Sequence, residues 1–142
     1  MILLDTNVIS EAMRERPNPA VRAWLKAQPR AEIWTASVVI AELLSGIESM
    51  PAGRKQTLLR ETIEDMIAED FRGQILTFNL PAARHYGQIL ASRRVAGRPI
   101  REMDAQIAAI ARAHGAALAT RNVRDFAGCN VAVVNPWEGS GK

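Results

Sequence analysis

Short apolar runs alternate along this chain with longer segments in which apolar side chains recur every three or four residues. Short apolar runs are typical of strands buried on both faces of a sheet, and the longer periodic segments are typical of helices. Their alternation predicts an α/β fold, with a mainly parallel central sheet of about five strands flanked by helices. The predicted strands are residues 2–4, 33–35, 74–78, 117–119 and 131–134.

Helices are predicted between these strands, and several have recognisable ends. Asn18 and Pro19 favour a helix start, and Gly115 favours a helix end. The clearest apolar stripe consists of Ile100, Met103, Ile107 and Ile110. The predicted helices are residues 8–15, 19–27, 37–49, 54–67, 81–96 and 101–114. Residues 1–137 are expected to form a single domain, and residues 138–142 a disordered polar tail.

Composition excludes several classes of protein. Hydrophobic residues make up 48% of the chain and charged residues 23%, which is ordinary for a globular domain. No apolar stretch is long enough to cross a bilayer, so no membrane association is expected. The single cysteine, Cys129, rules out an internal disulfide and a zinc-ligand cluster, which favours a reducing cytoplasm. A net charge of +3 is compatible with RNA as a partner but does not establish it.

Three carboxylates stand in apolar surroundings. Asp5 ends the first predicted strand, Glu42 lies within the apolar segment 38–44, and Asp104 adjoins the stripe of the last helix. A buried carboxylate must be paired, protonated or bound to a metal. Each acid also has a simpler interpretation. Asp5 is suited to cap a helix, Glu42 to face solvent or an arginine, and Asp104 to complement a helix dipole.

Polar residues also follow the fourth predicted strand. Thr120, Asn122 and Asp125 come just after residues 117–119, and Thr6 and Asn7 come just after Asp5. Asn122 and Asp125 are also common turn residues. Because the carboxyl ends of parallel strands share one edge of a sheet, these groups are expected to meet. Four acids in one pocket would repel one another without a divalent cation, so the set favours a Mg²⁺ or Mn²⁺ site for phosphodiester chemistry.

An ordered set of motifs resembles the PIN-domain proteins of the VapC/FitB toxin group. The motifs are residues 1–11, 35–43 with Gly46, 99–100 with Asp104, 107–109, 118–122 with Asp125 and Phe126, and 134–137. The resemblance implies a Rossmann-like fold and a Mg²⁺- or Mn²⁺-dependent endoribonuclease. Asp5, Glu42 and Asp104 match three of the family's acids. Asp125 is assigned as the fourth, with Thr6, Asn7, Thr120 and Asn122 as supporting groups, and the number of metal ions stays open.

The same resemblance implies a mechanism and partners. A metal held by Asp5 and Asp104 would polarise the scissile phosphate of RNA, and Glu42 or Asp125 would orient the attacking water. The expected products carry a 5′-phosphate and a 3′-hydroxyl. The chain is expected to be the toxin of a type II toxin–antitoxin module. A homodimer is expected, held inactive in a higher hetero-oligomer with a small antitoxin whose C-terminal segment crosses the pocket. Operator DNA would be bound only through the antitoxin, and the RNA target is not specified by the sequence.

Two other classes of function are compatible with parts of the sequence. A phosphatase would use Asp5 as nucleophile, but the haloacid dehalogenase type needs a second aspartate where this chain has Asn7. A non-catalytic PIN-like binding module is the second, and the presence of all three core acids argues against it. Trp24, Trp34 and Trp137 fit either an interface or the core. The segment 54–67 fits either internal packing or an antitoxin helix.

Overall fold

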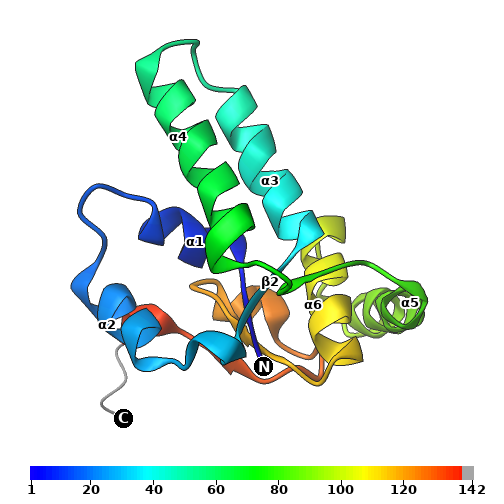
Figure 1. Ribbon diagram of the computed structural model, residues 1–142. Coiled ribbons are helices and arrows are strands. Elements are labelled where there is room, and N and C mark those ends of the chain that lie inside the picture. Colours follow the sequence, from blue (N-terminus) through cyan, green and yellow to red (C-terminus); the bar gives the residue numbers. More distant parts are fainter. Residues whose placement is uncertain (139–142) are drawn as a thin grey trace.

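The central sheet has five parallel strands, as the hydrophobic pattern predicts. A computed structural model describes residues 1–138, and the strand order is β3-β2-β1-β4-β5 (Figure 1). The strands are β1 (Ile2–Leu4), β2 (Ile33–Ala36), β3 (Ile75–Leu76), β4 (Ala117–Ala119) and β5 (Val133–Val134). The two edge strands β3 and β5 are shorter than predicted, because each pairs with its single neighbour over two residues only. The predicted α/β class is confirmed.

The strand order reverses at β1, and this fixes the place of the site. Strand β1 pairs with β2 on one side and with β4 on the other. The chain therefore moves outward through β2 and β3, then returns to place β4 next to β1. In an open parallel sheet, the crevice beyond the carboxyl ends of two such strands is where ligands bind.

Within residues 1–138, six helices connect and cover the strands. They are α1 (Thr6–Ala12), α2 (Pro19–Ala27), α3 (Ser37–Glu48), α4 (Arg54–Asp65), α5 (Leu80–Val95) and α6 (Glu102–Ala113). Helix α1 begins two residues before the predicted start, because Asp5 caps it directly after β1. Helix α4 ends at Asp65 and continues as a wider π-helical turn, η2 (Met66–Asp70), instead of running on to residue 67.

Short turns of 3₁₀ helix complete the chain. They are η1 (Arg30–Glu32), η3 (Val123–Phe126) and η4 (Pro136–Glu138). Glu138, expected to begin the disordered tail, is the last residue of η4. The remainder of that expected tail, residues 139–142, lies outside the described residues.

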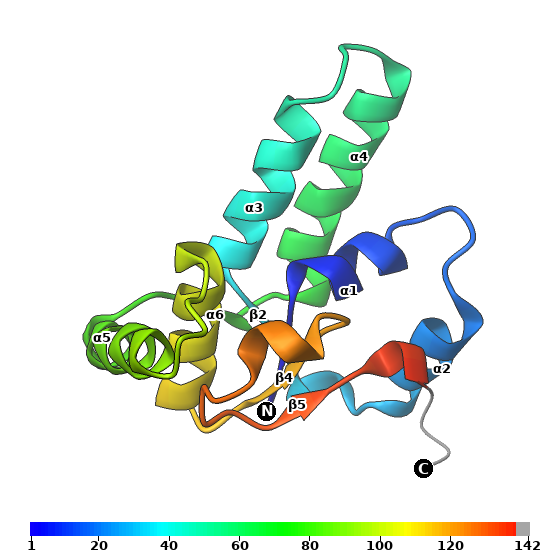
Figure 2. The same cartoon turned by 180° about the vertical axis from the view of Figure 1, so that it is seen from behind.

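The helices lie in three groups around the sheet. Helices α3 and α4 form an antiparallel pair that projects beyond the sheet, and α5 and α6 pack together on one side (Figure 1). Helix α2 packs with η4 at the opposite end, as the reverse view shows (Figure 2). Within residues 1–138, no helix is long and apolar enough to cross a membrane.

The core confirms the predicted apolar stripe of α6. Ile107 and Ile110 have no exposed surface, and they belong to one apolar cluster with Leu3 and Leu118 of the central strands. Most of α6 is buried, so the helix is held rigidly against the sheet. Its first turn carries Asp104, and this packing therefore fixes the position of that carboxylate.

Candidate active site

The site lies at the carboxyl ends of β1 and β4, where the strand order reverses. Asp5 follows β1 directly and Thr120 follows β4 directly. The backbone N–H of Asp5 donates to the carbonyl oxygen of Ala119 at 2.9 Å, so the pairing of the two strands extends to the acid itself. The expectation that these two segments meet at one edge of the sheet is correct.

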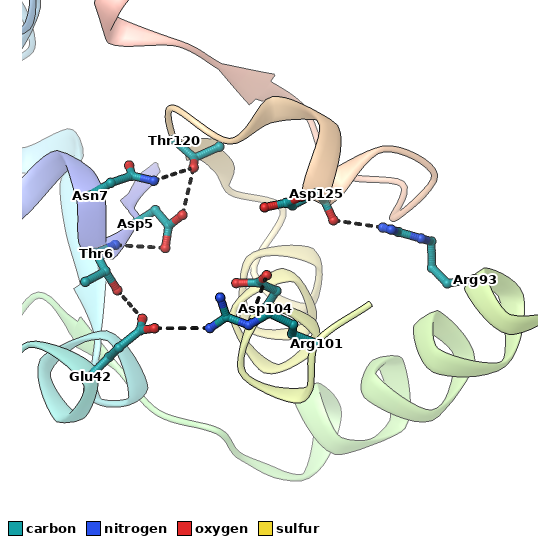
Figure 3. A network of polar contacts seen from close by, with 9 residues as sticks. All are labelled: Asp5, Thr6, Asn7, Glu42, Arg93, Arg101, Asp104, Thr120 and Asp125. Atoms are coloured by element: carbon teal, nitrogen blue, oxygen red, sulfur yellow. Dashed lines mark hydrogen bonds and ion pairs between the residues drawn. The ribbon is translucent and has the colours of Figure 1, made fainter. Parts of the chain in front are cut away.

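Two hydrogen bonds hold the Asp5 carboxylate (Figure 3). Its Oδ1 accepts from the backbone N–H of Thr6 at 2.8 Å, and its Oδ2 accepts from the Thr120 hydroxyl at 2.7 Å. Asp5 is therefore the cap of α1, as the simpler interpretation expected, and also a member of the pocket. The two roles are compatible, because the cap fixes the orientation of the carboxylate.

Thr120 is the hub of the polar network behind Asp5. Its hydroxyl oxygen accepts from the side-chain amide of Asn7 at 3.2 Å and from the backbone N–H of Asn122 at 3.0 Å. The Asn7 side-chain oxygen in turn accepts from the backbone N–H of Arg121 at 3.1 Å. Thr120 is fully buried, so it supports Asp5 from beneath rather than facing a ligand.

Glu42 and Asp104 face each other across Arg101. Glu42 accepts from the Thr6 hydroxyl at 2.5 Å and from Nη2 of Arg101 at 3.4 Å. The Nε of Arg101 lies 3.9 Å from Oδ2 of Asp104. Figure 3 shows the guanidinium between the two acids. The sequence-based alternative that Glu42 pairs with an arginine is therefore correct, and Arg101 is a site residue that the motifs did not indicate.

Three of the four predicted acids line one cavity of about 470 Å³. Its wall contains Asp5, Glu42 and Asp104, together with the predicted supporting residues Thr6, Asn7 and Asn122. We call this cavity the acidic pocket.

Burial and mutual repulsion disfavour the charged forms of two of these acids. The pKa of Asp104 is raised from 3.8 to about 6, mainly because its carboxylate is removed from water. Arg101 opposes this rise, and Asp5, Asp125 and Glu42 add to it. The pKa of Asp5 is also raised by burial, against the hydrogen bonds from Thr120 and Thr6. Acids whose pKa values are shifted by burial and by neighbouring charges are typical of functional sites.

Asp125 lies at the edge of this group rather than in the wall of the acidic pocket. It belongs to η3 and is exposed, and its carboxylate points toward Asp104 in Figure 3. It is close enough to raise the pKa of Asp104. Its predicted role as the fourth acid stays a prediction.

Arg93 holds the turn that carries Asp125, and the sequence motifs missed it. This arginine of α5 is buried, and its Nη1 donates to the carbonyl oxygens of Asp125 at 2.8 Å and Ala127 at 3.0 Å. Its Nε donates to the carbonyl oxygen of Arg98. The sequence feature that could have identified Arg93 is its helical spacing from Ala82 and Ile89, which places a charged residue on the buried face of α5.

The donor chemistry of the acidic pocket fits a hard divalent cation. Carboxylate and hydroxyl oxygens are the ligands that Mg²⁺ and Mn²⁺ prefer. The raised pKa values arise mainly from burial, with a smaller contribution from repulsion between the acids, so a cation among them would favour their charged forms. Across residues 1–138, no three His, Cys, Asp or Glu side chains converge closely enough to hold an ion. The guanidinium of Arg101 stands between Glu42 and Asp104, so metal binding would require this arginine to move aside.

Comparison with known proteins identifies relatives of the whole chain. The PIN domain family model matches residues 2–128. The VapC ribonuclease Y4jK of Sinorhizobium fredii is 38% identical, over 97% of this chain and 99% of its own length. Toxin FitB of Neisseria gonorrhoeae is 41% identical, over 96% and 99%. A solved structure of FitAB bound to an IR36 DNA fragment matches with a TM-score of 0.90 and 40% identity, over 96% of each chain.

Proposed function

Since this chain belongs to the PIN-domain family, we propose that it is a Mg²⁺- or Mn²⁺-dependent endoribonuclease, the toxin of a toxin–antitoxin pair. The observation that carries the proposal is the convergence of Asp5, Glu42 and Asp104 on one cavity at the point where the strand order reverses. The names of the relatives, a VapC ribonuclease and the toxin FitB, support it.

Each residue of the acidic pocket has a distinct task in this proposal. Asp5, Glu42 and Asp104 would hold the metal, which lowers the pKa of a bound water and polarises the scissile phosphate. Thr120 and the backbone of Thr6 keep the Asp5 carboxylate in one orientation. Thr6 also orients Glu42 through its hydroxyl. Arg101, displaced from the acids, is free to pair with a phosphate of the RNA.

A neutralising partner is part of the proposal, because the relative FitB is named a toxin and a similar solved structure is a FitAB complex. An apolar groove between α1, α3 and α4 adjoins the acidic pocket, sharing Thr6 and Glu42 with it. Its apolar wall is lined by Met13, Leu43, Ile47, Met50 and Leu59. We propose that the C-terminal segment of a small antitoxin lies in this groove and reaches across to the acids.

The remaining partners follow the same family pattern. We propose a homodimer in the cytoplasm that contacts operator DNA only through the antitoxin. The FitAB structure with a bound DNA fragment supports the DNA part of this proposal. RNA is proposed as the substrate, and its sequence is not specified by the pocket.

The decisive experiment measures cleavage of single-stranded RNA by the purified chain in Mg²⁺, in Mn²⁺ and in EDTA. We expect cleavage with either metal, none in EDTA, and none by Asp5→Asn or Asp104→Asn. Glu102→Gln is the matched control, because Glu102 is an exposed acid in the same helical turn as Asp104. Cleavage that persists in EDTA would contradict the metal requirement. Hydrolysis of small phosphate esters without RNA cleavage would favour the phosphatase alternative.

A further inference from the structure

Next to the acidic pocket, an arginine is stacked on a tryptophan. The guanidinium carbon of Arg121 lies 5.1 Å from the ring centroid of Trp137, in cation–π geometry. Both residues line the acidic pocket. They also line a second hollow of about 360 Å³ that continues away from it. We call this pair the Arg121–Trp137 platform.

The platform is fixed relative to the acids by the backbone. Arg121 follows Thr120, whose hydroxyl holds Asp5, and its own N–H donates to the side chain of Asn7. Trp137 is half-buried in η4, which packs on α2. The backbone N–H of Trp137 donates to the side-chain oxygen of Asn135. Because both partners are anchored, a ligand on the platform would sit at a defined position relative to Asp5.

The guanidinium of Arg121 has binding capacity that the described chain does not use. Arg121 is exposed, and among residues 1–138 it takes part in no salt bridge. Its guanidinium carbon lies over the ring of Trp137. Its N–H donors and its other face are available to a ligand that offers both a flat ring and acceptor atoms.

The second hollow also carries positive charge suited to a phosphate backbone. Arg14 and Arg16 line it together with Arg121. The buried Glu11 in its wall is already occupied, because it pairs with Arg14 and accepts from the backbone N–H of Asn18. That last bond is the main reason why the pKa of Glu11 is lowered, so this acid stays charged and paired.

We propose that the Arg121–Trp137 platform binds a nucleobase of single-stranded RNA, next to the phosphate that lies in the acidic pocket. Unstacked bases are recognised by stacking on aromatic rings and on arginine planes, with arginines along the backbone. The base stacks on the free face of Arg121, and its sugar–phosphate chain continues past Arg14 and Arg16. The inference rests on the proposed function, and it gives that function a positioning element for substrate.

The test separates stacking from charge. Fluorescence anisotropy of a labelled single-stranded RNA, in EDTA so that no cleavage occurs, measures affinity for the wild type, Arg121→Ala and Arg121→Lys. We expect both substitutions to weaken binding about 5- to 100-fold, because lysine keeps the charge and loses the plane. An oligomer of the same length without bases should bind wild type and Arg121→Lys equally.

A control variant and a second variant of the platform test whether the loss of affinity is specific to the Arg121–Trp137 platform. Arg84→Ala removes the same charge from an exposed position on α5, far from α2 and η4, and should change affinity by less than about twofold. Trp137→Leu removes the ring behind Arg121 and should weaken binding in the same direction as Arg121→Lys. Circular dichroism establishes that each variant keeps its fold.

The outcomes distinguish this inference from the proposed function. Suppose that the wild type cleaves RNA in Mg²⁺ while Arg121→Ala and Arg121→Lys keep wild-type affinity and KM. The proposal that the platform binds a base is then wrong, and the proposed nuclease function is still supported. If the wild type neither binds nor cleaves RNA, both fail. If the Arg121 variants bind RNA normally and lose only a protein partner, the platform belongs to that partner and the inference is overturned.

Discussion

Removing the charge of Asp104 should stabilise the metal-free protein at neutral pH. The change Asp104→Asn keeps the shape of the side chain and removes a carboxylate that burial and its acidic neighbours disfavour. Most substitutions of a buried residue destabilise a fold. A gain in stability here would therefore be specific evidence for uncompensated charge in the acidic pocket.

The pKa of Asp104 determines how large this gain in the free energy of unfolding is and how it depends on pH. Its value rises from 3.8 to about 6 in the folded chain, so the protonated form stabilises the fold below pH 3.8, and this contribution is lost as the pH rises through 6. Two pKa units correspond to roughly 3 kcal/mol as an upper bound. Since the side chain is 13% exposed beside a solvated arginine, we expect the variant to gain about 1–2 kcal/mol above pH 6.

The assay is urea unfolding followed by circular dichroism, in EDTA, at a series of pH values from 4 to 8. The difference in free energy of unfolding between Asp104→Asn and wild type should be near zero at the acid end and grow as the pH rises through 6. Glu102→Gln, in the same helical turn, should show no gain, because an exposed acid there favours the helix dipole. A variant no more stable than wild type at pH 7.5 would refute the argument.

Three further predictions concern the surroundings of the site. Gly46 lines the antitoxin groove, and a Cβ there meets nothing within 4 Å, so Gly46→Trp should place a large side chain in the groove. RNA cleavage should persist while inhibition by the antitoxin is lost. Gly87→Trp, where a Cβ is equally unobstructed but lies on α5, should stay inhibited. Arg93→Ala should lower the free energy of unfolding by about 2–4 kcal/mol in urea titrations, because the part-buried carbonyl oxygens of Asp125 and Ala127 lose a buried charged donor. An unchanged midpoint would contradict this. Asp125→Asn should reduce kcat for RNA cleavage more than Asn122→Ala does, and the reverse order would assign the fourth position to Asn122.

The position of a site residue could be predicted from the sequence where it depends on a single strand or helix. Asp5 could be placed at the carboxyl edge of a strand, because three apolar residues precede it and a cap position follows. Asp104 could be placed on α6 because the apolar stripe fixes which way the helix faces. Both inferences need only the periodicity of a strand or a helix.

Contacts between distant segments could not be predicted in this way. Arg101 pairs with Glu42 across 59 positions, and nothing in either segment specifies the other. The turn η3 that carries Asp125 depends on Arg93, which lies 32 positions earlier on another helix. The pairing of Arg121 with Trp137 likewise requires β5 to place η4 beside the end of β4.

The bond between Asp5 and Thr120 also sets when activity can arise during synthesis. The two residues are 115 positions apart, and the hydroxyl that orients the first acid is among the last parts of the domain to be translated. A nascent chain that stops before β4 has a first strand with no partner on that side and an acid without its support. A growing polypeptide therefore cannot assemble the acidic pocket in full until β4 and Thr120 have been made, so the site proposed for RNA cleavage forms late in synthesis.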